Sequence, residues 1–235
     1  MAARRWSLST EAAGERWLLV SGGSGGIGSA VCAGLAERGI RPIVGYHHNE
    51  AAARAVAERC GGRALRLDLG DTQSVAAAAP ALAELPALLG VVLAGAPPLN
   101  LVSFGQISAE ELLLQWHINV LGPQQLLSQL VKHCFRRRKA GTVVGVLTSA
   151  MGSRDTPAAS GMGAYVIGKH GLAGVLALLA ADYPWLRVRS VSPGFTETKM
   201  LDAFDPRFLE LQRAKAPFQT PGSVARQILQ EALDS

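Results

Sequence analysis

The sequence predicts an α/β protein with one doubly wound parallel sheet of six strands, and three observations support this. Short apolar runs alternate with longer amphipathic or alanine-rich segments along all 235 residues. No repeat, linker or change in composition divides the chain, and a glycine-rich loop joins the first apolar run to the first helix. Such alternation places helices on both faces of a parallel sheet and ligands at the carboxyl ends of its strands. We expect a tail over residues 1–16 and one domain over residues 17–235.

The first half of the chain predicts four strands and three helices. The first helix is followed by Gly39, a residue type that readily takes the left-handed conformation beyond a helix end. Asn49 and Asp71 are suitable N-caps for the next two helices. The fourth strand is apolar throughout, as expected when both faces of a strand are covered. In order, we expect strand 17–20, helix 27–38, strand 42–46, helix 49–60, strand 64–67, a helix from Asp71 to about 85, and strand 88–94.

The second half predicts two further strands. Residues 108–135 form either one long helix or a broken pair, because Gly122 and Pro123 lie inside the segment. The remaining expected elements are strand 142–147, helix 163–181, strand 188–191, and helices near 202–214 and 223–233.

Composition excludes several classes of protein. Hydrophobic residues make up 49% of the chain and charged residues 17%, a balance opposite to that of disordered proteins. No uncharged apolar run of membrane-spanning length with flanking anchors is evident, and residues 1–17 lack the apolar core of a signal peptide. The three cysteines are widely spaced and odd in number, which favours reduced thiols and a cytoplasmic location.

The net charge of +5 could attract an acidic partner, but it forms no long basic stripe. The densest run is Arg136, Arg137, Arg138 and Lys139, without interleaved aromatic residues, so a nucleic-acid role is not expected. A metal site is not expected either, because no third ligand stands at suitable spacing from the adjacent His47 and His48.

The glycine-rich loop runs from Ser21 to Gly28, directly after the first strand and before a helix. Glycines permit positive φ angles and close approach of the backbone to a pyrophosphate, and the helix N-terminus offers unpaired N–H groups. The spacing of Gly22, Gly26 and Gly28 is G-x-x-x-G-x-G. A flexible connector is the alternative interpretation, since a glycine pattern alone is a weak signal.

Tyr165 and Lys169 stand one helical turn apart, so one helix face presents a phenol and an ammonium group. A nearby cation favours the phenolate, which would lower the tyrosine pKa toward the range useful for a general acid. Taken alone, the pair could equally be two surface residues.

The chain resembles the classical short-chain dehydrogenase/reductases over about residues 17–233, and among them most closely the 3-oxoacyl-acyl-carrier-protein reductases. The motifs fall in the family's order: the glycine loop, Leu93-Ala94-Gly95, Asn119, Ser149, the Tyr165–Lys169 pair, and Ser192-Pro193-Gly194. The resemblance implies a Rossmann-type fold and a carbonyl reductase that uses NAD(P)H.

The resemblance also implies the roles of the site residues. Tyr165 would donate a proton to the substrate carbonyl, Ser149 would hydrogen-bond that oxygen, Lys169 would lower the Tyr165 pKa and bind the nicotinamide ribose, and Asn119 would hold a relay water or form a structural kink. Thr148, Ser153 and Ser160 compete with Ser149, which we prefer because it follows the fifth strand. The residues implied in cofactor binding are Gly22, Ser24, Gly26, Ile27, Gly28, His47, Asp68, Leu69, Ala94, Gly95, Tyr165, Lys169, Pro193, Gly194 and Thr196.

Three departures from the family pattern stand out. The segment Val92-Leu93-Ala94-Gly95 replaces the family's Asn-Asn-Ala-Gly, the loop 153–163 is a few residues longer than usual, and no seventh strand follows the last helix. We therefore expect the sixth strand to form an edge of the sheet.

We expect NADP(H) rather than NAD(H), because the second strand is followed by His47 and His48 and not by the acidic residue that binds a ribose 2′-hydroxyl. The expected substrate is a 3-oxoacyl thioester, with an alcohol, sugar or steroid as the alternative and a non-catalytic cofactor sensor as the second alternative. An acidic acyl carrier protein could dock on residues 136–139, although cations at a helix C-terminus also complement the helix dipole.

The two long helices predict a homodimer, with a tetramer requiring a different second contact. The residues expected on the packed helical face are Leu112, Leu113, Trp116, Leu172, Val175 and Leu179.

Overall fold

The computed structural model describes residues 14–234 and contains one six-stranded parallel sheet with the strand order β3-β2-β1-β4-β5-β6. The predicted fold class is confirmed, and every expected strand is present within one or two residues of its expected bounds. The first thirteen residues of the expected tail lie outside the described part. The strands are β1 Trp17–Ser21, β2 Arg41–Tyr46, β3 Arg63–Arg66, β4 Leu88–Leu93, β5 Thr142–Val146 and β6 Arg187–Val191.

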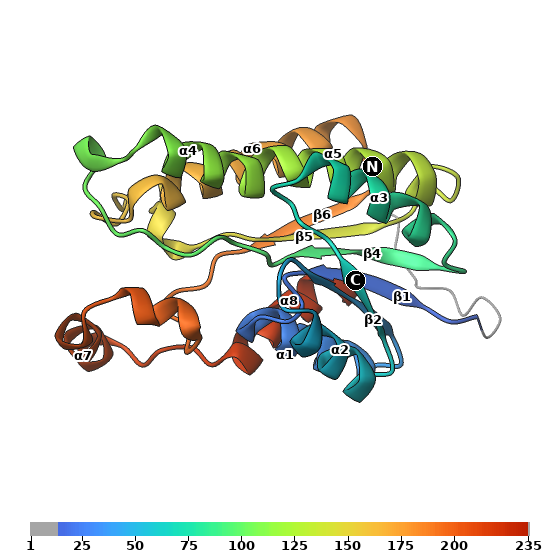
Figure 1. The fold of residues 1–235 in the computed structure, drawn as a ribbon, viewed down its shortest axis with the longest axis horizontal. Coiled ribbons are helices and arrows are strands. Elements are labelled where there is room, and N and C mark those ends of the chain that lie inside the picture. Colours follow the sequence, from blue (N-terminus) through green and yellow to red (C-terminus); the bar gives the residue numbers. More distant parts are fainter. Residues whose placement is uncertain (1–13, 235) are drawn as a thin grey trace.

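Helices cover both faces of this sheet (Figure 1). Alternate residues of a strand point to opposite faces, so Leu18 and Val20 of β1 pack on one side, and Trp17 and Leu19 pack on the other. The first side meets α1, α2 and α8, and the second meets α3, α5 and α6. The helices are α1 Gly26–Ala36, α2 Glu50–Arg59, α3 Thr72–Ala83, α4 Ala109–Trp116, α5 Gly122–Leu130, α6 Gly163–Asp182, α7 Pro206–Lys215 and α8 Pro221–Leu233.

The expected helix caps form as their residue types predict. The side chain of Asn49 accepts a hydrogen bond from Ala52 N, and that of Asp71 accepts one from Gln73 N. Gly39 takes a φ of 65° in the turn after α1, three residues past the helix end, where other residue types would be strained. These contacts are local in sequence, which explains why residue type alone locates the helix ends.

The segment expected as one helix or a broken pair is a continuous helical run with two π-turns. α4 passes into a π-turn at His117–Leu121, then into α5, and a second π-turn spans Val131–Phe135. Pro123 is accommodated near the start of α5. Gly122 is required by packing, because a Cβ there would lie 2.0 Å from the backbone oxygen of Leu69. Single π-turns inside helices are frequent at functional sites, and the first of these contains Asn119.

The end of the chain differs slightly from expectation. The helix expected near 202–214 is divided into a 3-10 turn at Lys199–Ala203 and α7, because the Asp205 side chain accepts hydrogen bonds from two backbone N–H groups of the first turn of α7. Figure 1 shows α7 standing away from the sheet, on the side of the molecule where α4 begins.

The strand β6 forms an edge of the sheet, as expected. It pairs only with β5 in the described range 14–234, and no seventh strand occurs there. Arg189 and Ser190 are exposed along this edge. Arg189 Nε lies 3.5 Å from a carboxylate oxygen of Glu231 in α8, so one helix partly shields the edge.

The helix α6 is long and apolar enough to cross a membrane by length and composition alone, but it contains Lys169 and is therefore not an uncharged apolar run. Its Leu172, Leu176 and Leu179 side chains are nevertheless buried in the core against the sheet. The helix therefore occupies the position of a central core helix in this fold.

Candidate active site

The glycine loop between β1 and α1 is built by close backbone contacts. A Cβ on Gly22 would lie 2.7 Å from Gly95 Cα, and a Cβ on Gly28 would lie 2.2 Å from the backbone oxygen of Gly22. Gly22 also has a φ of 64°. These positions require glycine, so the loop is not the flexible connector that was the alternative interpretation.

The loop has the properties of an anion cradle. Gly25 is the N-cap of α1, and Ser24, Gly26 and Ile27 are at least partly accessible beside it. The first N–H groups of a helix point away from the helix and carry partial positive charge, which favours phosphate oxygens.

The end of β4 lies against this loop. Ser21 Oγ accepts a hydrogen bond from Gly95 N at 3.2 Å, which fixes Ala94 and Gly95 beside the glycines. The Leu69 side chain approaches the same place, with its Cδ1 3.6 Å from the Cβ position of Gly95. The structure thus brings together the cofactor-loop residues and the segments after β3 and β4.

A histidine–aspartate pair stands at the ends of β2 and β3. His47 Nε2 lies 2.8 Å from Asp68 Oδ2, and the His47 and His48 ring centroids are 3.2 Å apart. The other Asp68 oxygen accepts a hydrogen bond from Gly70 N at 2.8 Å. The three residues directly after β2 include no acid, but Asp68 brings a carboxylate to His47 from the segment after the neighbouring strand β3.

Tyr165 and Lys169 lie on the buried face of α6, so they are not surface residues. They are 6% and 2% exposed, and Lys169 Nζ lies 5.8 Å from the centroid of the Tyr165 ring. The lysine donates a hydrogen bond to the backbone oxygen of Val146, at the end of β5, at 2.9 Å. This contact directs the ammonium group toward the carboxyl end of the central strands.

Burial dominates the titration of both groups. It lowers the pKa of Lys169 to about 8 and raises the pKa of Tyr165, an effect that a hydrogen bond with Thr148 partly offsets. The expected lowering of the Tyr165 pKa by Lys169 is therefore not found, since desolvation of the phenolate is the larger influence.

Ser149 lies three residues after the end of β5 and starts a 3-10 turn. Its backbone N donates to Pro193 O at 2.9 Å, and its Oγ lies 3.7 Å from the Cβ position of Gly194. Of the competing hydroxyl groups, Thr148 contacts Tyr165, whereas Ser153 and Ser160 lie exposed in the loop before α6.

The segment after β6 is held by a residue that the sequence analysis missed. Gln219 Oε1 accepts a hydrogen bond from Gly194 N at 2.9 Å, and its backbone N donates to Phe195 O at 2.8 Å. Thr196 Oγ1 donates to Gly194 O at 3.0 Å. Gln219 stands 25 positions from Gly194 and carries no local motif, so nothing in the sequence indicated it.

Asn119 is 1% exposed and lies against α6. A Cβ on Gly168 would lie 3.1 Å from Asn119 Nδ2, which places the amide next to the residue that precedes Lys169. The Asn119 Oδ1 atom is buried and has no hydrogen-bond partner among the described residues. It can therefore accept a hydrogen bond from a bound water or ligand.

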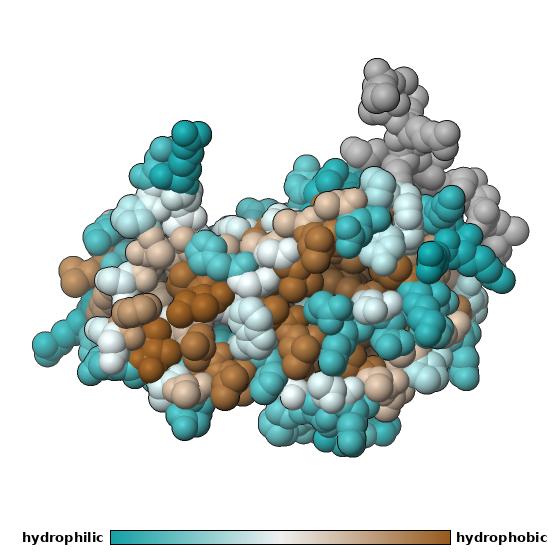
Figure 2. Space-filling view, turned by 90° about the horizontal axis from the view of Figure 1, so that it is seen from above, coloured by the Kyte–Doolittle hydropathy of each residue, from teal (hydrophilic) through white to brown (hydrophobic). Residues whose placement is uncertain are grey.

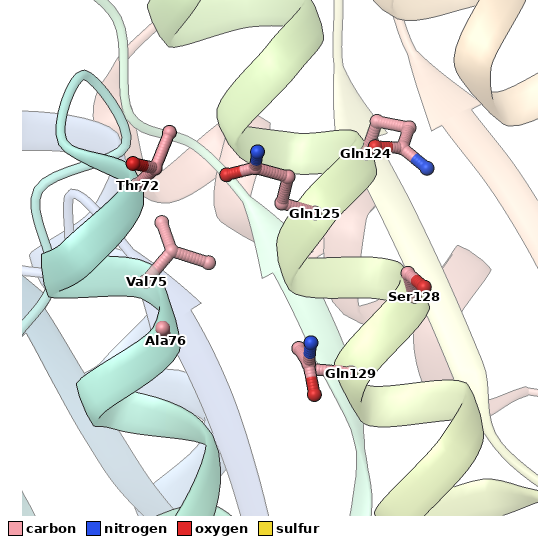
Figure 3. A pocket seen from close by; sticks show the side chains of 7 residues that line it. All are labelled: Thr72, Val75, Ala76, Gln124, Gln125, Ser128 and Gln129. Atoms are coloured by element: carbon pink, nitrogen blue, oxygen red, sulfur yellow. The ribbon is translucent and has the colours of Figure 1, made fainter.

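Two pockets lie outside, or at the margin of, the cluster formed by the glycine loop and the residues around Ser149, Tyr165 and Lys169. One, of about 240 Å³, lies between α3 and α5 and shares no residue with the cluster (Figure 3); it is lined by Thr72, Val75, Ala76, Gln124, Gln125, Ser128 and Gln129. The other, of about 450 Å³, includes Gly194, Phe195 and Gln219 and reaches α7 and α8. The second pocket therefore adjoins the segment after β6.

The basic run at residues 136–139 lies at the amino ends of the strands, opposite the end that carries Ser149. It precedes β5, whereas Ser149 follows it, and the Arg138 guanidinium donates to the backbone oxygen of Leu88 at the start of β4. Within residues 14–234, no three His, Cys, Asp or Glu side chains form a group suited to a metal ion.

Comparison with known proteins agrees with this arrangement. The sequence profile described as short chain dehydrogenase matches residues 16–207. The chain is 31% identical over 189 residues to a 2,5-dichloro-2,5-cyclohexadiene-1,4-diol dehydrogenase of Sphingobium indicum, covering 78% of this chain and 74% of that protein. It is 31% identical over 198 residues to a 3-oxoacyl-[acyl-carrier-protein] reductase of Bos taurus, covering 81% and 80%.

Among solved structures, the chain is similar to a 3-ketoacyl-(acyl-carrier-protein) reductase from Brucella melitensis complexed with NADH. The TM-score is 0.83 at 20% identity, and the match covers 96% of this chain and 93% of that chain. This likeness concerns the fold.

Proposed function

Because the chain belongs to the short-chain dehydrogenase family of NAD(P)-dependent oxidoreductases, we propose that it is an NADPH-dependent carbonyl reductase whose substrate is a 3-oxoacyl thioester. The main support for a reductase is the placement of Ser149, Tyr165 and Lys169. All three lie at the carboxyl ends of β5 and the start of α6, where ligands bind in open α/β sheets.

The residues present fit a dinucleotide. The glycine loop leaves Ser24, Gly26 and Ile27 at least partly accessible beside the N-terminus of α1, and Asn119 Oδ1 is a buried acceptor that needs a donor. We propose that Gly22, Ser24, Gly26, Ile27 and Gly28 hold the pyrophosphate. When bound, the cofactor supplies a hydride to the carbonyl carbon.

A second group of residues would position the rest of the dinucleotide. Their places at the ends of β3, β4 and β6 surround the glycine loop, as the contacts of Gly95, Leu69 and Gly194 indicate. The members of this group are Asp68, Leu69, Ala94, Gly95, Pro193, Gly194 and Thr196.

In the proposed mechanism, Tyr165 gives its proton to the carbonyl oxygen, and Ser149 Oγ hydrogen-bonds the same oxygen. Lys169 has three N–H donors and uses one on Val146 O, so two remain for the ribose hydroxyls and for the region of the phenol. A charge near the phenol would oppose the rise in its pKa that burial causes. Asn119 would hold a water that returns protons to the site.

We further propose that the cofactor is NADP(H). The side chain of His47 is 43% exposed at the end of β2, where it can offer a hydrogen bond or, when protonated, a charge to a 2′-phosphate. Asp68 orients this ring but also places a carboxylate nearby. The attraction of His47 for the 2′-phosphate and its repulsion by Asp68 together decide the preference between NADPH and NADH.

The substrate class is supported by the relatives. A reductase of 3-oxoacyl chains on a carrier protein is among them, and so is an acetoacetyl-CoA reductase of Paracoccus denitrificans. A dehydrogenase acting on a small diol, alcohol or sugar is the second candidate, favoured by the diol dehydrogenase of Sphingobium indicum and a D-threitol dehydrogenase of Mycolicibacterium smegmatis. A non-catalytic cofactor sensor is the third.

The test is turnover of NADPH by the wild-type protein with a 3-oxoacyl thioester, compared with a simple ketone, a sugar and a steroid ketone. We expect the thioester to give the highest kcat/KM. A higher value for another carbonyl class would replace the substrate proposal, and NADPH binding without turnover of any carbonyl would favour the cofactor sensor.

We also propose that residues 136–139 bind an acyl carrier protein. Residues 136–139 are exposed, but they precede β5, so the length of the strand separates them from Ser149. Changing Arg136 and Arg137 to Glu should raise KM for a carrier-bound substrate and leave KM for a small thioester unchanged. Equal effects on the two substrates would mean that the run does not bind a carrier.

We also propose a homodimer formed through α4 and α6. Leu113, Trp116 and Leu178 are 54%, 47% and 64% exposed, and Figure 2 shows apolar side chains gathered on the side of these helices. Leu172 and Leu179, expected on this face, are instead buried in the core. Light scattering should give a dimer that Trp116→Glu converts to a monomer, and a wild-type monomer would contradict the proposed interface.

A cytoplasmic location is the last part of the proposal. It is supported by the three free thiols, Cys32, Cys60 and Cys134, none of which forms a disulfide.

A further inference from the structure

Two polar side chains on the α4–α5 helical run are almost completely buried. Gln115 is 0% exposed and Asn119 is 1% exposed, one turn apart along the run. Burying a glutamine is unfavourable unless its amide is hydrogen-bonded, so the amide of Gln115 needs hydrogen-bond partners inside the protein.

The hydrogen bonds between these residues have a fixed direction. Asn119 Nδ2 donates to the backbone oxygen of Gln115 at 3.1 Å and to Gln115 Oε1 at 2.9 Å. Gln115 Nε2 donates to Glu111 Oε1 at 3.4 Å. A backbone carbonyl and an ionised carboxylate only accept, so both amides are held in one orientation.

The consequence concerns the free atom of Asn119. Its two amide hydrogens have acceptors on Gln115, and the remaining polar atom, Oδ1, is buried without a partner among the described residues. The backbone oxygen and the side-chain oxygen of Gln115 together leave Asn119 one free polar atom, which can only accept a hydrogen bond.

The packing of α6 places this amide beside the candidate active site. A Cβ on Gly168 would lie 3.1 Å from Asn119 Nδ2 and 3.2 Å from Gln115 Cβ. Gly171 makes a second close approach, since its Cβ would lie 2.4 Å from Val120 Cγ2. The small residues on α6 thus hold the Gln115–Asn119 pair against the turn that carries Lys169.

We infer that Gln115 is a positioning residue of the reductase, which keeps the Asn119 carbonyl oxygen directed toward a donor in the active site. Glu111, which is partly exposed, fixes the orientation of the Gln115 amide, and Gln115 helps to fix the orientation of the Asn119 amide. The group that donates a hydrogen bond to Asn119 Oδ1 is a water or a ribose hydroxyl. This inference rests on the proposed function, because Asn119 acts in turnover only if the protein is a reductase.

The experiment compares two side chains that are similar in size to glutamine, one apolar and one polar. Gln115→Met removes both polar atoms, so Asn119 loses one acceptor; kcat should fall roughly 3- to 10-fold while KM and cofactor affinity stay unchanged, as expected for loss of one hydrogen bond. Gln115→Glu should retain most of kcat. Beside Glu111 its buried carboxyl will be protonated, so it can donate to Glu111 and accept from Asn119.

A role in packing alone predicts the opposite order, because an apolar Met suits a buried position better than a carboxyl group does. The inference is supported if kcat falls from the wild type to Gln115→Glu and further to Gln115→Met. It is overturned if Gln115→Met has a higher kcat than Gln115→Glu. Gln124→Met on exposed α5 surface is the matched control and should leave kcat unchanged.

A double variant tests whether Gln115 acts through Asn119. If it does, Gln115→Met combined with Asn119→Ala should have the kcat of Asn119→Ala alone, whereas independent roles would multiply the two losses. Should Gln115→Met not fold, Glu111→Leu takes its place. It should lower kcat roughly 2-fold with unchanged KM, on the scale of a weak hydrogen bond, and an unchanged kcat would overturn the inference.

The wild-type protein separates the two levels of failure. If it reduces no carbonyl substrate, the proposed function fails and the inference fails with it. If it does reduce one and the variants show the packing order or multiplied losses, only the inference about Gln115 fails.

Discussion

The two halves of the candidate site are built by different means. Around the glycine loop, the decisive contacts are between backbone atoms, as at Gly22 and Gly28. These contacts are possible because glycine has no side chain. Around Tyr165 and Lys169, the decisive groups are buried polar side chains with incomplete hydrogen bonding. The first half should therefore fail by losing its shape, and the second half should fail in its chemistry while the fold survives.

The largest effect should come from the chemical half. Tyr165→Phe keeps the ring in its buried place and removes the hydroxyl, so turnover should fall roughly 100-fold or more while NADPH affinity stays the same. Steady-state kinetics and a fluorescence titration of the cofactor measure the two quantities. Near-normal turnover would show that another group delivers the proton, with Thr148 as the first alternative.

The loop half should break differently. In Gly28→Ala the new Cβ would lie 2.2 Å from the backbone oxygen of Gly22, so the loop must move. We expect a loss of stability of about 1–3 kcal/mol, as for overpacked sites, and a weaker NADPH affinity. Gly174→Ala is the control, because a Cβ at Gly174 in α6 meets nothing within 4 Å.

Thermal unfolding with and without NADPH separates these variants. Gly174→Ala should be neutral or up to about 1 kcal/mol more stable, from helix propensity. If Gly28→Ala keeps wild-type stability and cofactor affinity, the steric account of the loop is wrong.

The buried ammonium of Lys169 should appear in the pH dependence of stability. Its pKa is about 8 in the folded protein against 10.5 for an ordinary lysine, so above pH 8 the unfolded chain binds more protons. Stability should then rise with pH, by at most about 1.4 kcal/mol per unit from this group. Burial raises the pKa of Cys32 from 9.0 to about 12, which opposes the trend above pH 9.

Denaturant unfolding between pH 8 and 9 is therefore the suitable measurement. The slope with pH should be smaller in Lys169→Met than in the wild type, and Lys199→Met, at an exposed position, should follow the wild type. Equal slopes in all three proteins would mean that Lys169 titrates as an exposed lysine does.

The smallest effect should lie at the adenosine end. His47→Ala removes one donor near a 2′-phosphate, so the preference for NADPH over NADH should fall roughly 3- to 10-fold, the value of about one hydrogen bond. Titrations with both cofactors measure the ratio, with His48→Ala in parallel. An unchanged ratio in His47→Ala and a reduced one in His48→Ala would assign the phosphate to the second ring.

Features that depend on neighbours in sequence were predictable. The glycine spacing located the loop, and Gly39, Asn49 and Asp71 located helix ends, because their contacts lie within a few residues. The alternation of apolar runs was sufficient for the sheet, since strands covered on both faces have no polar face to display.

Features that depend on distant contacts were not predictable. His47 meets Asp68 only because β2 and β3 are neighbours, and Gln219 reaches Gly194 only after the chain has passed through α7. The direction of the Tyr165 pKa was predicted wrongly for the same reason, because the degree of burial is a property of the packed molecule. Gln115 has no motif and became visible only through its burial.

The open edge of β6 has a consequence for handling the protein at high concentration. An unpaired strand edge can pair with another molecule, and the net charge of +5 opposes that contact by mutual repulsion between molecules. Salt shortens the range of this repulsion to about 3 Å at 1 M ionic strength. Solutions of this protein should therefore tolerate concentration better in dilute buffer than in concentrated salt.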